Sequence, residues 1–162
     1  MKRSANTLVW PVSTLLLALM LSILPMPGAT ANFRPDWTVL VMIFWLLNSP
    51  DRFGLLTAMF LGLALDTLSG ALLGQNALAM VIIAYLVLKF HLRLRISPIS
   101  QLTVTVFGLL VIYHFVLFWV DGVSGRTVPY SERWMPLMMS TFLWPLIQRA
   151  LHQKYSNGRA EV

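Results

Sequence analysis

Long charge-free stretches follow one another along the chain and divide it into apolar segments. These stretches cover residues 4–33, 37–50, 53–65, 67–88, 96–120 and 134–148. A helix needs about 20 mostly apolar residues, within a range of about 17–25, to cross the hydrocarbon core of a bilayer. The pattern therefore predicts an all-α fold, a multi-pass transmembrane bundle with about six spans near residues 8–25, 36–49, 53–70, 76–92, 101–121 and 133–151.

The second and sixth predicted spans are short, and five spans remain the alternative. Arg52 and Arg149 flank these two segments, and long basic side chains that reach the interface extend short spans. No internal repeat separates the chain into parts, so residues 1–162 are expected to form a single integral membrane domain. The turn and helix-breaking residues between the segments are Pro25, Pro27, Gly28, Asn48, Ser49, Pro50, Asp51, Gly70, Gly74, Asn76, Ser97, Pro98, Gly122, Gly125 and Pro129.

Composition agrees with a membrane protein and excludes several other classes. Of the 162 residues, 57% are hydrophobic and 11% are charged, and the mean hydropathy is +0.73. Soluble domains carry about 25% charged residues, so a soluble enzyme, a disordered tail and a free nucleic-acid binder are excluded. The chain has no Cys, which removes disulfides, thiol chemistry and Cys-ligated metals.

The net charge of +6 is mainly an orientation signal. With six spans and the N-terminus inside, nine of the 12 Lys and Arg residues fall on the cytoplasmic side. This distribution satisfies the positive-inside rule with both termini cytoplasmic. The cytoplasmic set is Lys2, Arg3, Arg52, Lys89, Arg93, Arg95, Arg149, Lys154 and Arg159, and the outer set is Arg34, Arg126 and Arg133.

Three residues of the cytoplasmic set form a basic cluster, defined here as Lys89, Arg93 and Arg95. Such clusters orient a membrane protein and attract anionic lipid headgroups. We favour this interpretation over a cytoplasmic protein partner, which stays open as the alternative.

The N-terminus has a second interpretation. Lys2 and Arg3, an apolar run over 8–24 and the sequence Ala29-Thr30-Ala31 are also typical of a cleavable signal peptide. Cleavage would leave five spans and an outside N-terminus. We favour the uncleaved helix, since the break at Pro25 and Pro27 is equally natural between two spans.

The most informative stretch combines three glycines with one acid. Gly62, Asp66, Gly70 and Gly74 are spaced by four residues, which places them close to one face of a helix. Small residues at this spacing let a second backbone approach closely. An ionisable residue inside a span faces the bundle interior or a cavity. Asp66 is therefore expected to clamp the packing by binding helix termini or a basic partner, with a proton or ligand site as the alternative.

Other polar residues carry weaker signals. His114 lies within the fifth segment without a second ligand at metal-binding spacing, so we expect a hydrogen-bonded packing role. Arg34, Pro35 and Asp36 precede the second span. Arg34 and Asp36 are expected either to pair or to bind the start of that helix, since a carboxylate there complements the dipole. We favour a structural cap over a binding site. No nucleotide fingerprint or catalytic triad pattern occurs in the sequence, so neither an enzyme nor a cofactor is expected.

Taken together, these features resemble the MreD family of bacterial rod-shape-determining inner-membrane proteins. The resemblance covers approximately residues 8–151 and depends on the order and spacing of several short motifs. They are Phe33-Arg34-Pro35-Asp36-Trp37, Trp45, Pro50, Gly54, Gly62, Asp66, Gly70, Leu73, Gly74, Ala77-Leu78-Ala79, Ala84-Tyr85-Leu86 and Leu143-Trp144-Pro145.

The resemblance implies a non-enzymatic scaffold that maintains rod shape by coupling MreC and MreB to lateral peptidoglycan synthesis in the elongasome. It implies indirect association with RodZ, RodA and a class B penicillin-binding transpeptidase, contact with membrane lipid, and no nucleic-acid partner. The family is similar to the six-helix S-components of energy-coupling-factor transporters, which implies the same bundle. The Gly62, Asp66, Gly70 and Gly74 positions, and Arg34, Pro35 and Asp36, are then expected to shape the bundle or its partner face.

Two other functions compete with the scaffold. A small-molecule-binding or transport subunit on the S-component-like bundle would turn Asp66 and His114 towards a cavity, and the lack of several polar groups converging at mid-depth argues against it. An enzyme acting on lipid-linked wall precursors would need clustered carboxylates or a loop nucleophile. Neither is visible in the sequence.

Overall fold

The structure is a computed structural model that describes residues 3–24, 34–126 and 129–160. The described part of the chain forms six helices: α1 (Arg3–Ile23), α2 (Trp37–Asn48), α3 (Leu55–Ser69), α4 (Gln75–Arg95), α5 (Ile99–Val123) and α6 (Tyr130–Ala160). Each helix overlaps one predicted apolar segment, and the predicted all-α fold is confirmed. The predicted break at Pro25, Pro27 and Gly28 and the signal-peptide motif at 29–31 lie outside the described residues.

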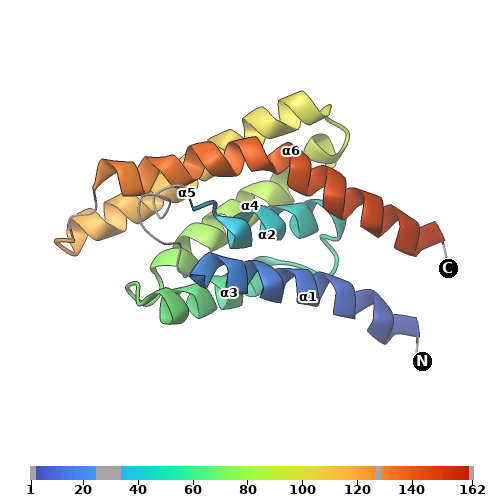
Figure 1. The fold of residues 1–162 in the computed structure, drawn as a ribbon, viewed down its shortest axis with the longest axis horizontal. Helices are drawn as coiled ribbons and strands as arrows, with labels where there is room; N and C mark the ends of the chain where they lie inside the picture. Colours follow the sequence, from blue (N-terminus) through green and yellow to red (C-terminus); the bar gives the residue numbers. More distant parts are fainter. Residues whose placement is uncertain (1–2, 25–33, 127–128, 161–162) are drawn as a thin grey trace.

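The helices run back and forth between the two ends of an elongated bundle (Figure 1). The beginning of α1 and the end of α6 lie at one end, which we name the terminal end (Figure 1). The α2–α3 and α4–α5 turns lie at this same end, whereas the α3–α4 turn lies at the opposite end, towards which the beginning of α2 faces. We name this opposite end the cavity end, because the cavity described in the next section lies there.

The short helix α2 forms the centre of the bundle. It packs against α1, α4 and α6, and each of its residues from Thr38 to Leu47 is buried. A helix that is apolar on all sides is expected to be surrounded by protein. Its 12 residues measure about 18 Å at about 1.5 Å per residue, which is shorter than a hydrocarbon core of about 30 Å. The helix at the second predicted span is therefore short and enclosed by the rest of the bundle.

Two hydroxyl groups of α1 attach this helix to α2. Thr14 Oγ1 accepts a hydrogen bond from the buried indole Nε1 of Trp45 at 2.8 Å and donates one to the carbonyl of Pro11 at 2.7 Å. Near the cavity end, the hydroxyls of Ser22 and Thr38 lie 2.8 Å apart. These bonds fix α1 along α2 where apolar packing alone would allow sliding.

Length and apolar composition make two of the described helices long enough to cross a membrane, α4 and α5. The described apolar stretches Val9–Ile23, Trp37–Asn48 and Leu55–Ser69 are shorter. Six full spans therefore stay a prediction from the sequence.

The outer surface of the bundle is apolar. Met20, Phe60, Val104 and Phe142 are each at least 65% exposed, and they lie on four different helices. Large exposed apolar areas are rare on soluble monomers. This surface fits a bundle that is surrounded by lipid or by other apolar helices.

Candidate functional site

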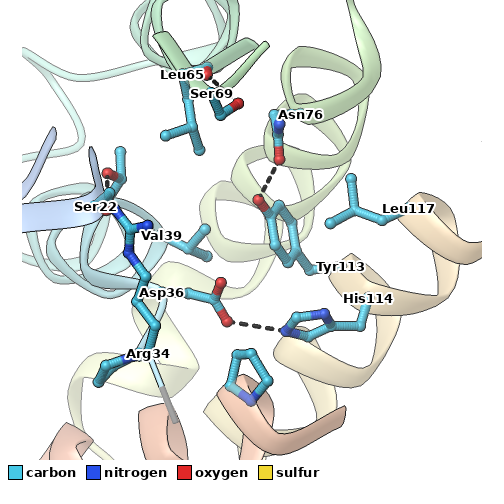
Figure 2. Close-up of a pocket in the computed structure, with 13 residues that line it drawn as sticks. Ser22, Arg34, Asp36, Val39, Leu65, Ser69, Asn76, Tyr113, His114 and Leu117 are labelled. Atoms are coloured by element: carbon cyan, nitrogen blue, oxygen red, sulfur yellow. Dashed lines mark hydrogen bonds and ion pairs between the residues drawn. The ribbon is translucent and has the colours of Figure 1, made fainter. Parts of the chain in front are cut away.

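A partly open cavity of about 490 Å³ lies at the cavity end, and all six helices contribute to its wall. Figure 2 shows Arg34, Asp36 and Val39 on one side and Tyr113, His114 and Leu117 on the other. The lining residues are Ser22, Arg34, Pro35, Asp36, Thr38, Val39, Leu65, Ser69, Asn76, Tyr113, His114, Leu117 and Pro136. The wall thus combines eight polar or charged residues with five apolar ones.

Asp36 and His114 meet across the cavity from distant parts of the sequence. The imidazole Nε2 of His114 lies 2.9 Å from Asp36 Oδ2, and the His114 side chain is 5% exposed. Ser140 of α6 accepts a hydrogen bond from the backbone N–H of Asp36 at 2.8 Å and donates its own proton to Asp36 Oδ2 at 3.3 Å. These bonds connect the beginning of α2 to α5 and α6.

The structure confirms Asp36 at the N-cap position of α2, but without a capping hydrogen bond from its side chain. The carboxylate binds His114 and Ser140 instead, because the tertiary fold brings these two donors to it.

Asp66 caps the next helix in the sequence. Its carboxylate accepts hydrogen bonds from the backbone N–H groups of Gly74 at 2.9 Å, Asn76 at 2.9 Å and Ala77 at 3.4 Å. Asn76 also donates its side-chain amide to Asp66 Oδ1 at 2.9 Å. The first N–H groups of a helix have no partner within the helix, and a negative charge there complements the helix dipole. Asp66 therefore fixes the end of α3 against the beginning of α4.

Gly62 lies one turn before Asp66 and allows α3 and α4 to touch. A Cβ atom at Gly62 would collide with the Cα of Ala77 and would lie 2.6 Å from its backbone N. Both Gly62 and Asp66 are buried against α4. These two positions shape the bundle from within and offer no free surface to a partner.

The expectation that Gly70 and Gly74 continue the same helix face is wrong. Helix α3 ends at Ser69, and both glycines lie in the turn that follows, with φ angles of +65° and +95°. Such left-handed backbone favours glycine because it has no Cβ. The four-residue spacing therefore continues beyond the end of α3, where it no longer places residues on one helix face. The two glycines instead lie in the turn that reverses the chain between α3 and α4.

Two further buried polar contacts were not predicted from the sequence. Tyr113 donates its hydroxyl proton to Asn76 Oδ1 at 2.6 Å, and Gln75 donates its amide to Asp121 Oδ1 at 3.0 Å. The Gln75-Asn76 pair at the start of an apolar segment was the available signal, since buried amides require partners. The carboxylate of Asp121 is 46 residues away, so no local pattern joins it to this pair.

Arg34 supplies the cation of the cavity. Its Nη2 atom is buried and has no hydrogen-bond partner among the described residues. Burial lowers the pKa of the Arg34 guanidinium from its ordinary value, and the charge of Asp36 opposes this shift. Pro35 is buried beside it, and its carbonyl accepts the N–H of Trp37 at 2.9 Å. Arg34, Pro35 and Asp36 thus all line the cavity.

The basic cluster lies away from the cavity, on the last turns of α4 at the terminal end. All three side chains are exposed. The ammonium of Lys89 lies 5.7 Å from the ring centroid of Tyr85 and 5.8 Å from that of Phe90. Aromatic faces attract a cation at this distance.

The chemistry available at the cavity is hydrogen bonding and charge pairing. Within the described residues, no group of three or more His, Cys, Asp or Glu side chains is placed to hold a metal ion. Five helices and the segment before α2 bring hydroxyl, amide, imidazole and charged groups to one cavity at the cavity end, a convergence that no pattern in the sequence predicted. The arrangement is that of a structural network around a small cavity.

Comparisons with known proteins give a consistent result. Residues 2–154 match the family described as rod shape-determining protein MreD. A protein named rod shape-determining protein MreD from Haemophilus influenzae is 26% identical over 146 residues, which covers 88% of this chain and 90% of the relative. No solved structure matches the chain, so the expected resemblance to S-component bundles stays a prediction.

Proposed function

We propose that this chain, which belongs to the MreD family of rod shape-determining proteins, is a multi-pass scaffold of the cell-elongation machinery in the bacterial inner membrane. The observation that carries the proposal is the family match over residues 2–154, nearly the whole chain. A role in determining rod shape follows from that membership. The coupling of MreC and MreB to lateral peptidoglycan synthesis, together with RodZ, RodA and the class B transpeptidase, is the finer part of the proposal.

The placement of charge supports both termini in the cytoplasm. The basic cluster lies at the terminal end. Arg52 lies in the α2–α3 turn at this end, and Arg149 lies on α6, the helix that ends there. Arg34 and Arg126 lie at the cavity end. The positive-inside rule then directs the terminal end to the cytoplasm and the cavity end to the periplasm.

The outer surface supports association through helices. Gly62 and Asp66 are occupied by contacts within the chain, so a single-span partner such as MreC would pack on the apolar exterior. Phe60 on α3 and Phe118 and Trp119 on α5 are among the exposed aromatic side chains there. The basic cluster is the natural contact for a cytoplasmic partner such as MreB, because it is exposed on the side assigned to the cytoplasm.

Complementation tests the proposal directly. We expect the chain, expressed in a rod-shaped bacterium depleted of its own MreD, to restore cylindrical growth and to retain tagged MreC during purification in mild detergent. Round cells and no recovery of MreC, at membrane levels equal to those of the host protein, would refute the scaffold. The Gly62→Leu variant is a matched negative control, since it blocks the α3–α4 contact.

The cavity favours one second candidate, a small-molecule-binding subunit. Its polar wall has the converging groups that such a site needs. A variant with a filled cavity distinguishes the two functions. Full restoration of rod shape by this variant would support the scaffold, because a ligand-dependent subunit would lose its function.

A further inference from the structure

The cavity contains one charged group whose hydrogen-bonding capacity is incompletely used. Arg34 Nη2 is buried and has no partner among the described residues. A buried donor without an acceptor is unfavourable, and more so when it carries charge. Asp36, which also lines the cavity, already accepts hydrogen bonds from His114 and Ser140 through Oδ2. The Nη2 atom of Arg34 therefore has room for an acceptor that the described residues do not supply.

The remaining wall suits a molecule with both a polar and an apolar part. Val39, Leu65 and Leu117 form apolar sections of the wall. Figure 2 shows Arg34 and Asp36 away from Leu65. A volume of about 490 Å³ lies within the range of about 300–1,000 Å³ that is typical of small-molecule sites. The cavity is partly open, so a ligand has a way in.

We propose that the cavity binds a phosphate-bearing amphiphile, with its phosphate on the guanidinium of Arg34 and its apolar part on Val39, Leu65 and Leu117. The planar fork of arginine matches the geometry of phosphate oxygens. Because the chain is surrounded by phospholipid in the membrane, an anionic phospholipid is the available source, and free phosphate is the other source of the same chemistry. The proposal does not depend on the role in rod shape.

Binding by the purified full-length chain in neutral detergent tests the proposal. Three probes are compared by thermal shift and by native mass spectrometry: dihexanoylphosphatidylglycerol, inorganic phosphate and a neutral monoacylglycerol of similar chain length. We expect the phosphatidylglycerol to stabilise the protein and the neutral lipid to have no effect. Equal stabilisation by inorganic phosphate would support the oxyanion site and identify free phosphate as its source. Equal effects of the neutral and anionic lipids would overturn the proposal.

Variants assign the binding to the cavity. Arg34→Gln should weaken phosphatidylglycerol binding about tenfold or more, whereas Arg126→Gln should leave it unchanged. Arg126 is a matched control because it is exposed at the same end of the bundle and does not line the cavity. Leu117→Trp should also abolish binding by filling the apolar part, which keeps the test decisive if Arg34→Gln does not fold. Wild-type affinity in either cavity variant would refute the site.

Discussion

Asp66 accepts both the backbone N–H and the side-chain amide of Asn76 on one carboxylate oxygen, at 2.9 Å each. This double contact joins the last turn of α3 to the first turn of α4 across a tight reversal of the chain. Asn76 in turn accepts the hydroxyl of Tyr113. One buried carboxylate thus organises three helices, and its removal should affect the whole bundle.

Replacing Asp66 should separate the effect of charge from that of hydrogen bonding. Asp66→Asn keeps one acceptor oxygen but turns a donor towards backbone N–H groups, so we expect it to lose about 1–3 kcal/mol of unfolding free energy. Asp66→Leu removes every acceptor and should lose more. Unfolding in detergent, followed by circular dichroism, measures both. Asp51→Asn is the control, because Asp51 is exposed in the turn before α3, and equal stability of all three variants would contradict the capping role.

Gly62→Ala should destabilise the bundle although alanine is the better helix former. A methyl group at this position collides with the backbone of Ala77, and overpacking of this kind is unfavourable by about 1–3 kcal/mol. Gly108→Ala is the matched control in α5, where a methyl group meets nothing within 4 Å among the described atoms. There, intrinsic propensity should stabilise the helix by up to about 1 kcal/mol. Melting temperatures that change in the same direction would argue against the close approach of α3 and α4.

Asp36 and His114 should be energetically coupled. We expect a double-mutant cycle with Asp36→Ala and His114→Ala to give an interaction free energy of about 0.5–3 kcal/mol, because each side chain is the partner of the other. Chemical unfolding of the purified protein supplies the four free energies. The pair Asp36→Ala and Asp51→Ala, at opposite ends of the bundle, should be additive within about 0.5 kcal/mol. If the effects of Asp36→Ala and His114→Ala are additive, the observed contact contributes nothing to the free energy of unfolding.

The absence of Cys makes the predicted orientation testable with single introduced thiols. Ser124→Cys lies after α5 at the cavity end, and Ser100→Cys lies at the start of α5 at the terminal end; both sites are exposed. In intact spheroplasts, a membrane-impermeant maleimide should label Ser124→Cys and should reach Ser100→Cys only after lysis. The reverse pattern would invert the assignment of the terminal end to the cytoplasm. Labelling of both thiols before lysis would contradict a spanning α5.

The sequence predicted the helices well because their cause is local. Apolar runs over 76–92 and 101–121 correspond to α4 and α5 since a helix satisfies its backbone hydrogen bonds within one segment. The same reasoning failed at Gly70 and Gly74, where a regular spacing continued through a turn. At Asp36 it predicted the position at the start of a helix but not the partners of the carboxylate. The partners of the Asp36 carboxylate lie 78 and 104 residues away in the sequence. The turn at Gly70 and Gly74 is local, and its contact with Asp66 spans only eight residues.

By itself, the sequence determined that this chain is a helical membrane protein, where its helices lie and, through its motifs, which family it resembles. Only the tertiary structure decided that α2 is the enclosed core and that Asp66 caps α4. It alone brought Asp36 to His114, 78 residues away, at the edge of a cavity to which Arg34 also contributes. Hydrophobicity and backbone geometry act over a few residues and can be read along the chain. The pairing of buried polar groups depends on which helices pack together, because each group must find its partner wherever the fold places one.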